Sequence, residues 1–154
     1  MKRLLPILLL VFSVGVGASD EDDLKKLKTT NECPKCDLSR ANLTGAYLRG
    51  VNLTGANLTE ADLTVIDLGF ADLTGADLSG ANLIDAYMED TNLQDANLAG
   101  ADLTKAYLEA TDLTGANLSR ANFTGAFLEG VNLENADLTD AVLTDTKLDR
   151  VKNL

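Results

Sequence analysis

A five-residue repeat constrains this chain more than any other feature of its sequence. From Cys36 to Arg150 the sequence runs in 23 uninterrupted pentads, beginning C-D-L-S-R and A-N-L-T-G. The third position is Leu in 21 of the 23 pentads, and Met88 and Phe123 replace it in the other two. The first position is mostly Ala, the second Asn or Asp, the fourth Thr or Ser, and the fifth often Gly. Because a period of five fits neither an α-helix nor a β-strand, we expect a solenoid whose units stack and bury little surface alone.

The A-(D/N)-L-x-x pattern resembles the pentapeptide-repeat family, and it covers about three quarters of the chain. The resemblance implies an all-β solenoid, a right-handed quadrilateral β-helix in which four pentads form one coil. The 23 pentads at 36–150 would then give about six coils. It also implies that the Leu and Ala positions point inward and the others outward. Leucine-rich repeats need a longer period with an L-x-x-L-x-L pattern, which the chain lacks.

Unusual residues recur at every fourth or every eighth pentad, as they would on successive coils of four pentads. Aromatic residues recur at the second position, acidic residues recur at the fourth position of the same pentads, and β-branched residues recur at the first position of the pentads that follow. The three rows are Tyr47, Tyr87, Tyr107 and Phe127; Glu89, Glu109, Glu129 and Asp149; and Val51, Thr91, Thr111, Val131 and Val151.

The aromatic and acidic rows share one face of the predicted solenoid, which is the candidate partner surface. An exposed aromatic strip beside carboxylates is typical of an interaction surface, and its charge suits a protein partner with a basic surface. Ordinary surface packing is the alternative interpretation of this face. The candidate residues are Tyr47, Tyr87, Glu89, Tyr107, Glu109, Phe127, Glu129 and Asp149.

The segment at 1–18 has the layout of a signal peptide. Lys2 and Arg3 precede an apolar run at 4–17, and Ala18 ends a stretch of small residues suited to cleavage. The run is short for a membrane span. We therefore expect cleavage after Ala18 and export to a periplasm, a thylakoid lumen or the extracellular space, with no membrane association afterwards. A retained N-terminal anchor is the alternative.

The segments that flank the repeats, 19–35 and 151–154, are expected to determine how the ends of the solenoid are closed. Residues 20–29 carry acids first and lysines last, as a short capping helix prefers. Leu24 and Leu27 lie on one face of that helix, suited to covering the first coil. The C-terminal tail is too short to cover the last coil, so a homodimer through that end is one candidate assembly.

Cys33 and Cys36 form a C-x-x-C motif where the cap meets the repeats. In the pentad frame, Cys33 takes a Leu-type inward position and Cys36 an Ala-type one. A disulfide that locks the cap suits an oxidising compartment. Two free inward thiols and a redox-active pair are the alternatives, although no βαβ pattern surrounds the motif.

Composition argues against catalysis. The chain has no His, so the commonest general base and metal ligand are missing, and two Cys cannot complete a four-ligand zinc site. The formal net charge of −11 opposes binding to nucleic acid and to anionic lipid. Second-position Asp residues suit the corner backbone groups and are interpreted as structural. We predict no catalytic residues, no cofactor and no metal site, and hence a non-enzymatic scaffold or protein-interaction module.

Two other functions compete with that prediction. No Lys or Arg occurs between Arg49 and Lys105, while ten acidic residues do. This belt is similar to that of the family branch that mimics DNA and protects type II topoisomerases, but those proteins act in the cytosol. A row of Thr on another face is similar to that of ice-binding β-helices, but Asn or Asp neighbours prevent a doubled Thr-x-Thr array. The row is Thr44, Thr64, Thr104, Thr124 and Thr144, interrupted by Ile84.

Overall fold

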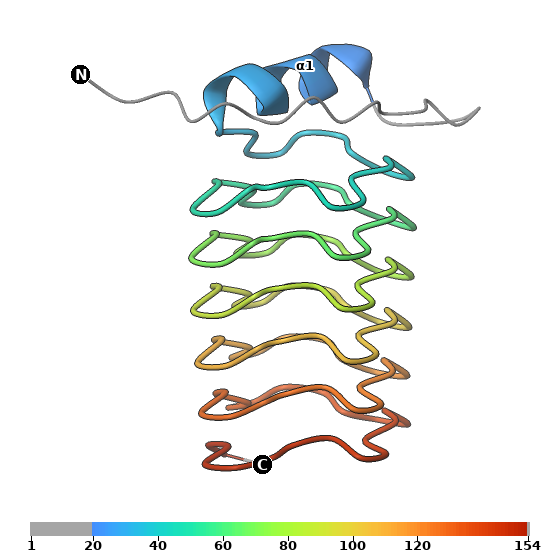
Figure 1. Ribbon diagram of the computed structural model, residues 1–154, viewed down its shortest axis with the longest axis vertical. Coiled ribbons are helices and arrows are strands. Elements are labelled where there is room, and N and C mark those ends of the chain that lie inside the picture. Colours follow the sequence, from blue (N-terminus) through green and yellow to red (C-terminus); the bar gives the residue numbers. More distant parts are fainter. Residues whose placement is uncertain (1–19, 154) are drawn as a thin grey trace.

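The computed structural model describes residues 20–153, and the expected signal peptide with its cleavage position after Ala18 lies outside the described residues. The chain winds into a stack of coils with helix α1, Glu21–Thr30, at one end (Figure 1). Within 20–153 the coils contain no continuous strand. They are joined by single-residue parallel bridges between second positions four pentads apart, as between Asn42 and Asp62. One coil is therefore four pentads, as the spacing of the aromatic row predicts.

First- and third-position side chains form the core of the stack. Third-position residues from Leu38 to Leu133 are at most 4% exposed. The β-branched Thr91 and Thr111 at the first position are also buried, and their hydroxyls donate hydrogen bonds to the carbonyls of Leu68 (2.8 Å) and Met88 (2.7 Å). Because these polar atoms are bonded, the hydroxyls are tolerated in an otherwise apolar interior.

Positions four and five turn each corner of the coil. The amide of the next pentad closes the turn, as between Ala41 N and Leu38 O at 3.1 Å. The fifth residue has a positive φ throughout, which a type II turn requires at its third residue. Glycine adopts this conformation freely, whereas the β-branched Val65, with φ 56°, is strained there.

Helix α1 covers the first coil. It begins after Asp20, whose carboxylate accepts a hydrogen bond from the amide of Asp22 at 2.8 Å, and it ends at Asn31 in the left-handed conformation. Leu24 is 6% exposed and Leu27 is 1% exposed, because both face the coil beneath. The apolar face of α1 thus shields the end of the core from water.

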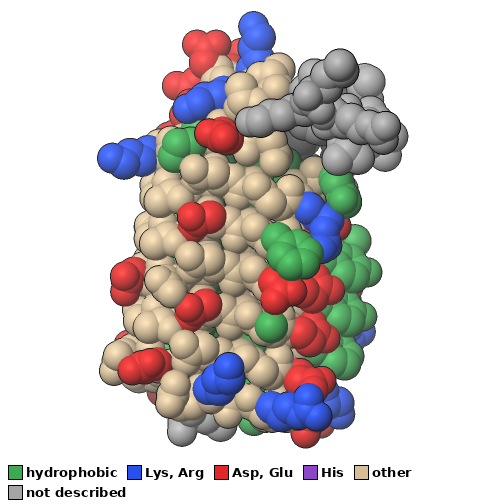
Figure 2. Space-filling model, turned by 90° about the vertical axis from the view of Figure 1, so that its left-hand side faces the viewer, with side chains coloured by type: hydrophobic (Ala, Val, Ile, Leu, Met, Phe, Trp, Pro, Cys, Tyr) green, Lys and Arg blue, Asp and Glu red, His purple; other side chains and the backbone are tan. Residues whose placement is uncertain are grey.

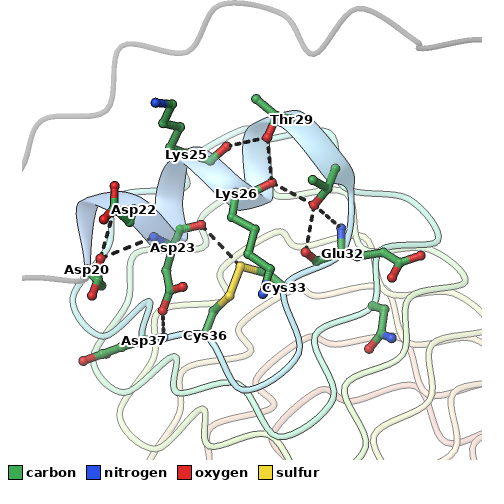
Figure 3. Close-up of a disulfide and its surroundings, with 12 residues drawn as sticks. Asp20, Asp22, Asp23, Lys25, Lys26, Thr29, Glu32, Cys33, Cys36 and Asp37 are labelled. Atoms are coloured by element: carbon green, nitrogen blue, oxygen red, sulfur yellow. Dashed lines mark hydrogen bonds between the residues drawn. A yellow bond between two sulfur atoms is a disulfide. The ribbon is translucent and has the colours of Figure 1, made fainter.

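A disulfide between Cys33 and Cys36 lies directly beneath α1 (Figure 3). Both cysteines are buried, in the inward positions that the pentad frame predicts. Asp23 of α1 accepts a hydrogen bond from the amide of Asp37 at 2.8 Å, which fastens the helix to the same coil. The bridge-and-turn pattern already occurs at 31–35, within the segment expected as the cap, and Cys33 takes the inward position that Leu has in later pentads.

The C-terminal end of the stack is open within the described residues. Leu138, Leu143 and Leu148 are only partly buried, unlike the leucines of inner coils. Amides of inner coils bond to the next coil, as Leu118 N does to Asp137 O at 2.8 Å, but the last coil has no following coil up to residue 153. The homodimer through this end stays a prediction.

Candidate functional site: an aromatic and acidic face

Second-position Asn and Asp side chains hold the turns on three faces of the coil. Asp72 is an example: its carboxylate accepts hydrogen bonds from the hydroxyl (2.6 Å) and the amide (3.0 Å) of Thr74. These two bonds hold the pKa of Asp72 below its ordinary value. Burial opposes the shift at Asp62 and Asp112, but the same kind of bonds still lower the pKa of both. These acids serve the turns, as the sequence predicts for most Asp residues.

The fourth side replaces these acceptors with rings over three coils. We call Tyr87, Glu89, Tyr107, Glu109, Phe127 and Glu129 the aromatic face. The rings of Tyr87 and Tyr107 stack with centroids 5.0 Å apart, those of Tyr107 and Phe127 with centroids 4.9 Å apart, and the interplanar angle is 2° in both pairs. An aromatic ring cannot accept the hydrogen bond that the fourth-position N–H donates on the other faces. Within 20–153 no other group accepts a hydrogen bond from the N–H of Glu89 or of Glu109.

The carboxylates of the aromatic face differ in their partners. Glu129 pairs with Arg150, with Oε1 3.2 Å from Nη1. Glu89 and Glu109 each have one oxygen, Oε2, that is shielded from solvent and accepts no hydrogen bond from any described residue. Because they occupy successive coils, about 4.8 Å apart, their charges repel each other. The middle of the aromatic face therefore carries negative charge that the described part of the chain does not compensate.

Next to the aromatic face lies a cluster that the sequence interpretation missed. The guanidinium of Arg49 is 3.0 Å from Asp67 Oδ1, and its Cζ lies 4.9 Å from the centre of the Phe70 ring. Gly69 makes the contact feasible, because a Cβ there would lie 2.5 Å from Arg49 Nη1. Phe70 is 59% exposed. Its signal in the sequence is an aromatic residue at the fifth position, where Gly is common.

The remaining predicted site residues lie in the same rows but outside the ring stack. Tyr47 is separated from Tyr87 by Asp67, which bridges to both, and it is 49% exposed. Asp149 lies on the last coil and is exposed. In Figure 2, acidic side chains gather along one edge of the rod beside exposed hydrophobic side chains, with basic side chains toward both ends of that edge.

Potential metal ligands converge at one place within residues 20–153. Asp23, Cys33 and Cys36 bring their ligand atoms within 4.8 Å of one another. The two sulfur atoms are bonded to each other, so they offer no thiolate to a metal.

As for membranes, none of the helical structure in the described residues has the length and apolarity of a spanning segment. The chemistry that the aromatic face offers is recognition by ring surface and carboxylate.

Comparison with known proteins identifies the repeat. The family model described as pentapeptide repeats matches eight copies, over residues 36–68, 66–98, 91–130 and 116–152. A search of curated proteins finds no match.

Solved structures give the same result. HetL from Nostoc sp. strain PCC 7120, a pentapeptide repeat protein involved in heterocyst differentiation regulation, is 38% identical with a TM-score of 0.77, over 78% of this chain and 56% of HetL. Rfr23 from Cyanothece 51142 is 32% identical with a TM-score of 0.56, over 82% and 97% of the two chains. A trypsin-treated form of QnrB1, a plasmid-mediated fluoroquinolone resistance protein, is 29% identical with a TM-score of 0.64, over 78% and 65%. The chain thus spans little more than half the length of HetL. It belongs to the pentapeptide-repeat family, and its fold is the right-handed β-helix of that family.

Proposed function

We propose that this protein is a non-enzymatic scaffold that binds another protein through its aromatic face, in an exported compartment. The observation that carries the proposal is the ring stack of Tyr87, Tyr107 and Phe127 at positions where most other pentads use turn-holding Asn or Asp. Tyr87 is 40% exposed, so the stack presents ring surface to water. Exposed aromatic surface beside charge favours a binding role.

Stability alone does not account for the rings. A lost turn hydrogen bond costs about 0.5–1.5 kcal/mol. An aromatic pair contributes about 0.5–1.5 kcal/mol beyond its area burial. The two effects offset each other, so the fold is served about equally well by Asn and by an aromatic residue. Binding gives a reason for an aromatic residue at these positions, since tyrosine supplies contact area at low entropic cost.

Capture of a partner from the exporting compartment tests the proposal. The variant Tyr87→Asn/Tyr107→Asn/Phe127→Asn replaces each ring with the residue type that the other faces use, so it should fold and lose the partner that the native protein captures. The control is Thr104→Lys/Thr124→Lys on the threonine row, which should keep that partner. Equal capture by the aromatic-face variant, with loss in the threonine variant, would place the binding surface elsewhere.

Export is tested separately by intact mass. Material purified from its native source should lack residues 1–18 and begin at Ser19. A full-length cytosolic species would contradict export and favour the competing role in protecting a type II topoisomerase. Addition of the purified protein to a supercoiling assay then examines that role directly.

The arrangement of the acids between Arg49 and Lys105 favours binding of a protein partner through the aromatic face over mimicry of DNA. Five of the ten acids between Arg49 and Lys105 sit at second positions and accept the amide of the turn that follows. They are distributed over four faces rather than gathered on one; they are Asp62, Asp67, Asp72, Asp77 and Asp102. On the threonine row, the hydroxyls of Thr64, Thr104 and Thr124 already bond to second-position side chains, which weakens the case for ice binding.

A further inference from the structure

We propose that the middle of the aromatic face, Glu89 and Glu109 beside the stacked rings of Tyr87 and Tyr107, binds arginine side chains of the protein partner. This inference rests on the proposed function and adds the chemistry that the partner must carry. The chain itself places a guanidinium group, that of Arg49, on the neighbouring coil.

Arg49 shows how a guanidinium is held on this side of the solenoid. Its head group lies across Gly69, pairs with Asp67 at 3.0 Å and packs over the ring of Phe70 at 4.9 Å. One carboxylate and one aromatic ring therefore hold one guanidinium. The next two coils present the same two kinds of group at other positions of the pentad, with the ring at the second position instead of the fifth and the carboxylate at the fourth instead of the second.

On this side of the solenoid, arginines of the chain neutralise a carboxylate on each side of Glu89 and Glu109, but not these two. Arg49 pairs with Asp67 at one end, and Arg150 pairs with Glu129 at the other. Between them, Glu89 and Glu109 form no ion pair within residues 20–153, and each keeps a shielded oxygen without a hydrogen-bond donor. A carboxylate in that state gains from a cation at its accessible oxygen, because a charge-assisted hydrogen bond is stronger than the hydrogen bonds to water that it replaces.

The geometry favours arginine over lysine. Two carboxylates about one coil apart, roughly 4.8 Å, suit a planar fork with several donors, which can bond to both at once. The aliphatic stem of an arginine can lie along the edges of the stacked rings while its head group reaches the carboxylates. An ammonium group is a compact and strongly hydrated charge, so it gains less from the same surroundings.

A peptide titration tests this inference. The probe is a dye-labelled peptide of three Gly-Arg units, with the matching Gly-Lys peptide as its comparison, and binding is followed by fluorescence anisotropy. The test variant is Glu89→Gln/Glu109→Gln. The control is Glu134→Gln/Asp140→Asn, which removes the same charge from exposed positions away from the rings. Thermal melts followed by circular dichroism establish that both variants are folded.

The native protein should bind the arginine peptide at least about threefold more tightly than the lysine peptide, because only the guanidinium can bond to both carboxylates. Glu89→Gln/Glu109→Gln should weaken binding of the arginine peptide about tenfold and remove the preference. The control should change the affinity by less than about threefold, since it alters only long-range attraction. Equal losses in the two variants, or equal affinities for the two peptides, would overturn the inference.

The result separates this inference from the function on which it rests. If the peptides show no preference but Tyr87→Asn/Tyr107→Asn/Phe127→Asn still abolishes capture of the native partner, the aromatic face binds protein and the assignment to arginine is wrong. If that variant also captures the partner normally, both proposals are wrong. If Glu89→Gln/Glu109→Gln alone releases both the peptide and the partner, both are supported.

Discussion

The aromatic face and the face that carries Asn97 enclose the same interior and turn the same corners, yet their outer surfaces are built differently. Asn97 accepts the amide of Ala99, donates to Asp77 and accepts from Asn117, each at 3.1 or 3.2 Å. Tyr107 makes none of these bonds and stacks on rings above and below. The difference shows that the inward positions determine the coil. The residue at the second position can change from a turn-holding Asn to a stacked ring without a change in the coil.

The two faces share one interior, so a charge buried beneath either face should be the most damaging substitution. Leu98 lies under the asparagine face and Leu108 under the aromatic face, and both are 0% exposed. Leu98→Asp and Leu108→Asp each bury an unpaired carboxylate, which costs several kcal/mol against a total stability on the order of 10 kcal/mol. We expect both variants to lose cooperative thermal unfolding. A native-like melt of either one would show that the inward positions are assigned wrongly.

A smaller loss should follow removal of one turn-holding side chain. Asn97→Ala leaves the amide of Ala99 without its acceptor and interrupts the side-chain ladder between coils. The group is partly exposed, so we expect a loss of about 1–2 kcal/mol in the free energy of unfolding from urea titration. An unchanged value would mean that water replaces the asparagine without cost, and that the two faces do not differ in their support of the fold.

Two strained turn residues allow a matched comparison between faces. Val65 and Phe70 both occupy the fifth position with φ of 56° and 61°, and both are exposed. Val65→Gly should raise the free energy of unfolding by about 1 kcal/mol, because it relieves left-handed strain and removes no hydrogen bond, ion pair or ring contact among residues 20–153. Phe70→Gly relieves the same strain but removes the ring under Arg49, a contact of about 0.5–1 kcal/mol, so its net effect should lie near zero. Equal gains would imply that the Arg49 contact does not stabilise the fold.

Lowering the pH should change stability less than these substitutions do, and the change should come from carboxylates that hold turns. The pKa of Asp72 is lowered in the folded state by its bonds from Thr74. Its contribution to stability is therefore complete above the unfolded pKa, near 4, and is lost as pH falls through the lower folded value. Asp72→Asn keeps an acceptor for Thr74 without the charge, so its melting temperature should fall less steeply below about pH 4 than that of the native protein.

The control for the acid series is Asp95→Asn, which removes a charge from the same side of the coil. Asp95 is exposed at a fifth position, and its side chain accepts no hydrogen bond from another described residue. It should keep the native dependence of melting temperature on pH. Identical flattening in both variants would mean that net charge, rather than the turn bonds, sets the response to acid.

Much of this architecture was predictable from the sequence, because period, inward positions and coil length all repeat. Recurrence of Tyr87, Tyr107 and Phe127 at every fourth pentad was enough to place their rings in one stack. Where the repeat is irregular, prediction was weaker. The turn and bridge at 31–35 continue the pentad frame that places Cys33 inward, although the repeats are counted only from Cys36, because no Leu marks this pentad.

The contacts of the candidate site were less predictable than its rows. Arg49 reaches Asp67 and Phe70 on the following coil, and its place depends on the missing side chain of Gly69. Such contacts join different pentad positions across coils, so the period of the repeat carries no information about them. Only the three-dimensional structure shows that a guanidinium fits there, and that Glu89 and Glu109 have none among residues 20–153.

We infer that the fold does not need the aromatic row, and the decisive measurement is the free energy of unfolding of Tyr87→Asn/Tyr107→Asn/Phe127→Asn. Each asparagine restores an acceptor for a fourth-position amide, which offsets the loss of stacked rings. Urea titration should therefore give a free energy of unfolding within about 1 kcal/mol of the native protein. A loss of more than about 3 kcal/mol with an unchanged denaturant slope would show that the rings are part of the fold, and would remove the main reason for assigning them to a partner.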